Sequence, residues 1–254
     1  MNRRRRWRRW LIRAIVAFLG SRDIRIAGSV AAGCVAAWYA CDVLAVRARA
    51  CEPFQIRVRL RIDHSIAAGP IAARLKDEAD AIWRPYGIRL EWVDADSSEP
   101  AASGVSLDVT VERRFAGADG LEGSAIAGRT YVLPIGANWR PIRVSFDAIE
   151  NVIAGRTGAP ASGAAVVRNL ELGRALGRVL AHEIGHVLMD VPGHDRTGLM
   201  RPMFYAEQLA DADRSAFRLA CGAVDRLKHR LGVLNGGSTL DTLVDSRACV
   251  AVGP

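Results

Sequence analysis

Hydrophobic and polar residues alternate in three segments of the first half of the chain, a pattern typical of half-buried β-strands. The three segments are residues 54–62, 88–93 and 105–111. Between the first two, apolar residues recur at helical spacing from Ile71 to Ile82, and Pro85 and Gly87 end that helix. A strand, a helix and a strand in so short a stretch predict a crossover unit with parallel strands.

The second half of the chain changes from strands to helices. Residues 124–135 read as an edge strand or hairpin, because Pro134 cannot donate to a sheet ladder. The other expected elements are a short strand at 142–146 and helices at 147–154, 165–190 and 206–231. We therefore expect an α/β fold: a twisted, mostly parallel sheet with an antiparallel edge strand near 124–131, packed against helices 71–84 and 165–190.

The basic character of the chain belongs to its N-terminal leader. Residues 1–25 hold nine arginines and a single acid, Asp23. Of the 35 basic and 27 acidic residues in the chain, 26 of each remain when the leader is set aside. The body is thus neutral, and its charge does not indicate nucleic-acid binding.

An apolar run follows the leader. Residues 26–46 contain one charged residue, Asp42, and are long enough to cross a bilayer as a transmembrane or signal-anchor helix. The arginines before this run predict a cytoplasmic leader at 1–25 and a domain at 51–254 outside the membrane. Residues 48–50 match a signal-peptidase site, so cleavage and retention as an anchor are both open. A buried helix is the alternative.

The cysteines of the exported part add a limited constraint. Cys51, Cys221 and Cys249 are odd in number, so at most one intramolecular bridge forms among them. A bridge between Cys221 and Cys249 would attach the C-terminal tail, although the spacing does not establish that pairing.

The long helix carries the most informative residues. His182 and His186 lie four residues apart, which places both imidazoles on one helix face within reach of a single metal ion. Glu183 follows the first histidine directly, so its carboxylate lies near the ion and can accept a proton from an attacking water.

A catalytic zinc usually takes a third protein ligand and leaves one position for water. Pro192 and Gly193 break the helix, so the chain folds back and presents His194. Asp190 is the rival third ligand, because it lies four residues beyond His186. We favour His194, since imidazole is the commoner zinc donor.

The segment 182–203 resembles the metzincin clan of zinc peptidases, whose pattern is H-E-x-x-H-x-x-G-x-x-H followed by a methionine-containing turn. His182, Glu183 and His186 match directly, while His194 matches in role but two residues late. Met189 stands at the clan's helix-ending glycine, so Pro192-Gly193 is expected to make the turn here.

The resemblance extends loosely over residues 54–231, whose layout is similar to that of uncharacterised bacterial metzincin-like proteins. These proteins share an H-E-I-G-H core, a histidine eight residues on and a G-(I/L)-M-R turn. Residues 198–202 look like the methionine turn, in which Met200 would form an apolar floor under the ligands. Tyr205 would stabilise an oxyanion or, as we favour, have a packing role.

The resemblance also implies how a substrate would bind. Metzincins hold an extended peptide against the edge strand above the metal, and residues 123–131 correspond to that strand. The small residues Ala125 and Ala127 leave room for a neighbouring backbone, and Gly128 relaxes the geometry. An ordinary hairpin with small residues at its tip is the alternative.

These features together predict a zinc-dependent metalloendopeptidase that acts on a peptide or protein substrate outside the cytoplasmic membrane. Its membrane contact would be the N-terminal segment, and its cofactor Zn²⁺. Two alternatives are a zinc-binding extracytoplasmic protein without peptidase activity and a membrane-tethered interaction domain that binds no metal.

Overall fold

A computed structural model describes residues 53–66, 68–96, 104–114, 128–130, 139–154 and 164–234. All of them belong to one compact unit formed by residues 52–254. The predicted leader at 1–25 and the predicted span at 26–46 lie outside the described residues. Within the described ranges, no helix is long and apolar enough to cross a membrane.

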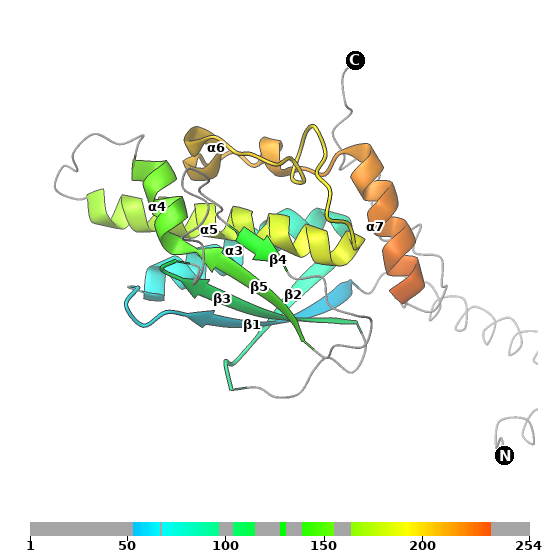
Figure 1. The fold of residues 1–254 in the computed structure, drawn as a ribbon, viewed down its shortest axis with the longest axis horizontal. Helices are drawn as coiled ribbons and strands as arrows, with labels where there is room; N and C mark the ends of the chain where they lie inside the picture. Colours follow the sequence, from blue (N-terminus) through cyan, green and yellow to red (C-terminus); the bar gives the residue numbers. More distant parts are fainter. Residues whose placement is uncertain are drawn as a thin grey trace, which may run out of the picture. The chain divides into compact units, whose positions relative to one another are not determined.

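A five-stranded sheet forms the base of the unit, with strand order β2-β1-β3-β5-β4 (Figure 1). The strands are β1 (Phe54–Ile62), β2 (Ile88–Val93), β3 (Val105–Glu112), β4 (Gly128–Thr130) and β5 (Arg140–Ser145). The first three and β5 run parallel, whereas β4 pairs antiparallel with β5 at the edge. The predicted crossover unit of β1 and β2 and the α/β class are confirmed.

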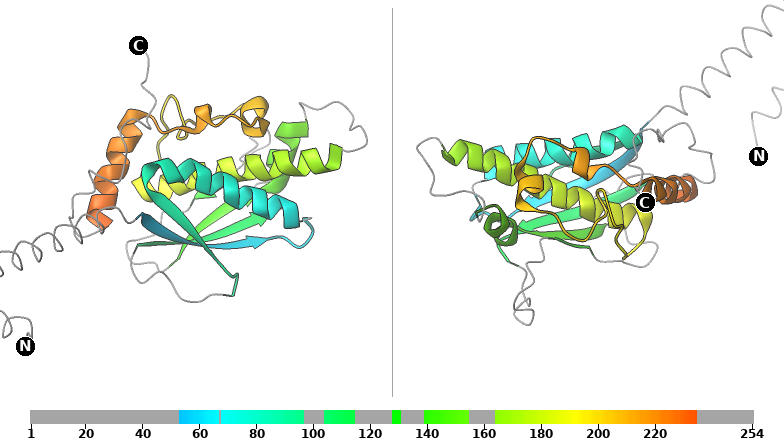
Figure 2. Two further views of the ribbon diagram at one scale, coloured as in Figure 1. Left: turned by 180° about the vertical axis from the view of Figure 1, so that it is seen from behind. Right: turned by 90° about the horizontal axis from the view of Figure 1, so that it is seen from above.

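Two helices cover one face of this sheet (Figures 1 and 2). They are α3 (Ala68–Trp83) and α5 (Ala164–Met189), close to the predicted bounds. The shorter elements are the 3-10 helix η1 (Arg84–Tyr86), α4 (Phe146–Ala154), α6 (Ala206–Ala210), the 3-10 helix η2 (Ser215–Phe217) and α7 (Cys221–Leu234). Apolar residues at alternate strand positions and along the inner stripes of α3 and α5 make a single core between the layers.

Two glycines set the spacing between α3 and α5. A β-carbon on Gly173 would lie 2.8 Å from the carbonyl oxygen of Ile71, and one on Gly177 would lie 2.7 Å from that of Leu75. The missing side chains therefore allow the two helices to pack closely enough for polar side chains of α3 and α5 to contact each other directly.

The predicted helix 206–231 is wrong, because α6, η2 and α7 occupy this range as three separate pieces. Asp211 is extended, and the Asp213 carboxylate accepts a hydrogen bond from the Ser215 backbone N–H at 3.0 Å. Such local side-chain bonds compete with helical backbone bonds. The Ala210 carbonyl is also bound by a side chain of α5, Arg174, so α6 ends there.

Candidate metal centre

The C-terminal half of α5 is buried around its whole circumference, and this places two polar residues in the interior. His182 is 7% exposed and Glu183 is 6% exposed. A helix can bury such groups only where they have polar partners, because an unpaired polar group in the interior costs free energy. The contacts of these side chains therefore indicate what the site is built to hold.

Backbone carbonyls fix the orientation of the first two histidines. Nδ1 of His182 lies 2.7 Å from the Leu199 oxygen, and Nδ1 of His186 lies 2.8 Å from the Val191 oxygen. A carbonyl oxygen only accepts, so each Nδ1 must be the donor of its hydrogen bond. In a neutral ring this uses the single proton, and Nε2 then presents a lone pair.

These two Nε2 atoms lie 3.0 Å apart. Two lone pairs at this separation repel each other unless a cation or an additional proton lies between them. Burial lowers the pKa of His182 to about 4, which opposes a proton on that ring. In a tetrahedral site with Zn–N bonds of about 2.0–2.1 Å, two nitrogens lie about 3.3 Å apart. The pair therefore fits a metal cation.

His194 completes a group of three imidazoles. One ring nitrogen from each of His182, His186 and His194 lies within 4.8 Å of the other two. The His194 ring stacks on His182 at 5.2 Å between centroids and meets His186 edge-on at 4.9 Å. Burial, and then the neighbouring His186, lowers the pKa of His194 as well. Neutral imidazole is the form that binds a metal.

Asp190, the rival third ligand, is placed differently. Its carboxylate lies 3.1 Å from Nη2 of Arg230, in an ion pair with α7, and it is not part of the histidine cluster. Its backbone is left-handed, with φ 55°. Aspartate tolerates this conformation better than most residues, so Asp190 ends α5 as a glycine commonly does. This corrects the expectation that Pro192-Gly193 would make the turn.

Helix α7 holds the segment that carries His194 at both ends. Besides the pair of Arg230 with Asp190, Nη2 of Arg226 lies 2.8 and 2.7 Å from the two carboxylate oxygens of Asp195. The third imidazole thus lies between two acidic residues that are each paired with an arginine of α7. Sequence reasoning missed both arginines, because their partners are far away in the chain.

Residues 198–201 form a tight turn under the cluster. Gly198 has φ 75°, and a β-carbon there would lie 2.3 Å from the Arg218 carbonyl oxygen, so only glycine fits. Met200 is 1% exposed, and its Sδ atom would lie 2.4 Å from a β-carbon on Gly185, the residue before His186. The turn therefore supplies the Leu199 carbonyl that orients His182, and it places the Met200 side chain against α5 at Gly185.

The aromatic residues after this turn differ in exposure. Phe204 packs edge-on against His182 at 5.9 Å between ring centroids. Tyr205 is 66% exposed, so most of its side chain does not pack against the domain. The chain is extended at Tyr205 just before α6 begins, which turns its side chain outward while its neighbour faces the cluster.

Glu183 lies against the edge strand. A β-carbon on Gly128 of β4 would lie 2.4 Å from Oε1 of Glu183. Sequence reasoning assigned Gly128 a role in relaxing the backbone, but the contact shows that its missing side chain makes room for the carboxylate. The small residues Ala125 and Ala127, predicted to contact a substrate, lie outside the described residues.

We expect Gly128→Ala to move the Glu183 carboxylate without touching the three histidines. A displacement of about 1 Å at a reacting group costs about a hundredfold in rate. If the site is a zinc peptidase with Glu183 as its base, as the sequence predicts, peptide cleavage should fall by about that factor, while zinc content stays at the level of the unmodified protein. Gly232→Ala on α7 is the control, since a β-carbon there meets no atom within 4 Å. Full cleavage by a folded Gly128→Ala protein would contradict this reading of the contact.

In comparisons with known proteins, no protein-family model and no curated protein sequence matches this chain.

Proposed function

We propose that this protein is a zinc-dependent metalloendopeptidase of the metzincin type, acting on peptides or proteins outside the cytoplasmic membrane. The observation that carries the proposal is the convergence of three imidazoles, with the buried Glu183 directly following the first of these histidines in the sequence. A purely structural metal site gains nothing from a carboxylate next to its first ligand, whereas hydrolysis needs a base there.

Each residue of the site has a role in this proposal. His182, His186 and His194 would hold the ion, and the turn containing Met200 would support them. A bound zinc would polarise the scissile carbonyl and lower the pKa of a water molecule toward neutrality. Glu183 would accept the proton of that water during attack and pass it to the leaving amine.

The edge strand offers a place for the substrate. Among the described strands, β4 has a neighbour only on its β5 side, and an extended peptide would pair with its other edge. The contact of Gly128 with Glu183 would bring such a peptide close to the base. Backbone pairing of this kind supplies affinity with little demand on substrate sequence.

A disulfide supports the proposed location. Cys221 at the start of α7 is disulfide-bonded. Disulfides persist mainly in oxidising compartments, and this agrees with export directed by the N-terminal segment.

Zinc analysis of the purified protein tests the metal site. We expect about one equivalent of zinc per chain, removed by a chelator and restored by added Zn²⁺. A folded protein that retains no zinc under these conditions would contradict the proposal and favour an interaction domain without a metal.

A further inference from the structure

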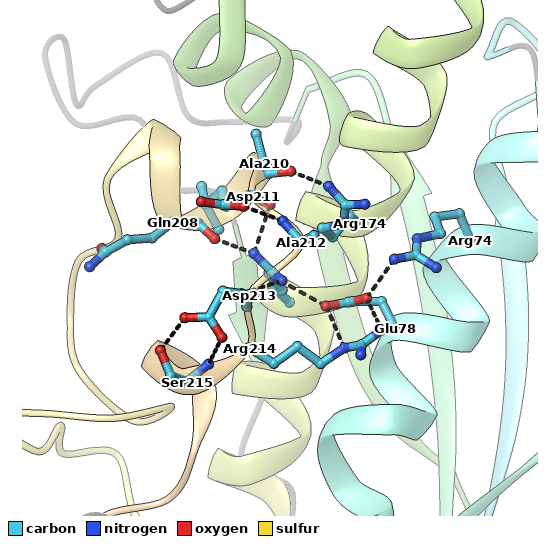
Figure 3. Close-up of polar contacts among 12 residues, drawn as sticks. Arg74, Glu78, Arg174, Gln208, Ala210, Asp211, Ala212, Asp213, Arg214 and Ser215 are labelled. Carbon is cyan, nitrogen blue, oxygen red and sulfur yellow. Dashed lines mark hydrogen bonds and ion pairs between the residues drawn. The ribbon is translucent and has the colours of Figure 1, made fainter.

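A buried ion pair joins α3 to α5 next to the candidate metal centre. Glu78 and Arg178 are both fully buried, and Nε of Arg178 donates to Oε1 of Glu78 at 2.9 Å. The same carboxylate accepts from Arg214 at 3.0 and 2.8 Å and from Arg74 at 3.2 Å (Figure 3). Glu78 thus gathers three arginines from three parts of the chain.

The remaining donors of Arg178 bind the chain that follows the methionine turn. Its Nη2 donates to the carbonyl of Asp213 at 2.8 Å, and its Nη1 donates to the carbonyls of Gln208 and Leu209. The guanidinium carbon of Arg178 lies over the ring of Phe217, 4.4 Å from its centroid. Glu78 therefore binds Nε of this guanidinium, while its two Nη atoms bind backbone carbonyls within residues 208–213.

Gln208 links these contacts to Phe204, the residue that packs against the ring of His182. The side-chain oxygen of Gln208 accepts from Nη2 of Arg201 and from the backbone N–H of Tyr205, the latter at 3.1 Å. The Arg201 guanidinium lies 4.4 Å from the ring centroid of Phe204, and Phe204 stacks on Phe217 at 4.8 Å.

The connected set of side chains starts and ends on the same helix. Arg178 precedes His182 by four residues, one helical turn, and Phe204 meets the ring of His182. The position of Phe204 relative to His182 therefore depends on two attachments to α5, the guanidinium of Arg178 and the methionine turn itself.

We infer that Arg178, held by Glu78, is a positioning residue of the metal centre: it fixes residues 201–213 so that Phe204 and the methionine turn keep His182 in its binding orientation. This inference rests on the proposed metal site. It assigns to a residue outside the ligand set an effect on how tightly and in what geometry the ion is held, since partners of metal ligands tune affinity through ligand orientation.

The chemistry of Arg178 suits a role in fixing neighbouring chain segments better than a role in folding stability alone. A buried ion pair contributes little net stability compared with a well-packed apolar pair, because both charges lose their hydration. Burial lowers the pKa of Arg178, and the charge of Glu78 opposes that shift. The planar fork can bind a carboxylate and several carbonyls in fixed directions at once, whereas the ammonium of a lysine has no fixed directions.

The test compares Arg178→Lys with Arg59→Lys. Arg59 is a matched control on β1, because it also binds one carboxylate, Asp108, at 3.2 and 3.1 Å and lies 4.3 Å from the ring centroid of Trp139. Zinc affinity is measured by competition with a chromophoric chelator, at a temperature where circular dichroism shows every variant folded. The visible absorption spectrum of the Co²⁺-loaded proteins reports the geometry around the ion.

We expect Arg178→Lys to weaken zinc binding by about tenfold, the lower end of the range for partners of metal ligands, and to shift the Co²⁺ spectrum. Arg59→Lys should change neither. Gln208→Ala, which keeps the buried ion pair but removes the link to Arg201, should act in the same direction with less loss of stability.

Zinc affinity and a Co²⁺ spectrum equal to those of the unmodified protein, in a folded Arg178→Lys and in Gln208→Ala, would overturn the positioning role and leave the proposed function intact. An unmodified protein that binds neither Zn²⁺ nor Co²⁺ would overturn both.

Discussion

Replacing Glu183 with Gln is expected to remove peptide cleavage almost completely while the protein keeps its zinc. The amide has nearly the same size and should fit beside Gly128, but it cannot accept the proton of the attacking water. General-base catalysis contributes about 10²–10⁴-fold to rate, and the loss should fall in that range. Zinc retention should be unchanged, because the three imidazoles are untouched.

Glu171→Gln is the matched control for this variant, since it makes the same change on the same helix outside the histidine cluster. Initial rates on a fluorogenic peptide, with zinc content measured on the same samples, separate loss of the base from loss of the metal. Cleavage by Glu183→Gln at the rate of the control would show that Glu183 is not the base.

The second large effect concerns the third ligand. His194→Ala should weaken zinc binding by more than about a hundredfold, beyond the cost of losing a partner of a ligand. Asp190→Asn is the comparison, because asparagine also tolerates the left-handed backbone at this position while losing the charge that pairs with Arg230. Its zinc affinity should fall far less.

Dialysis against a graded series of chelator concentrations measures both affinities. If Asp190→Asn lost its zinc and His194→Ala kept it, the Asp190 carboxylate would be the third ligand. The position of His194 beside the other two imidazoles would then not reflect metal binding.

Much of the architecture follows from periodicity alone. Strands β1, β2 and β3 and helix α3 lie at or near their expected bounds, because alternation and helical spacing record which side of each element faces the core. The spacing of His182 and His186 likewise places both rings on one face, and the break after α5 brings His194 back to them.

The sequence could not indicate contacts made between distant segments. Glu78 and Arg178 are a hundred residues apart, and each reads in isolation as an ordinary charge on a helix surface. The three pieces within 206–231 are a related case, because Arg174 and Arg178 bind carbonyls that a continuous helix would use itself. The requirement for glycine at position 128 is a third case, because it follows from the contact with Glu183, which is distant in the sequence.

Digestion of a peptide library by the zinc-loaded protein tests the peptidase proposal most directly. We expect cleavage at internal peptide bonds, lost on chelation, restored by Zn²⁺ and absent in Glu183→Gln. A folded protein that carries one equivalent of zinc and cleaves no peptide, or one whose cleavage survives both chelation and Glu183→Gln, would contradict the account.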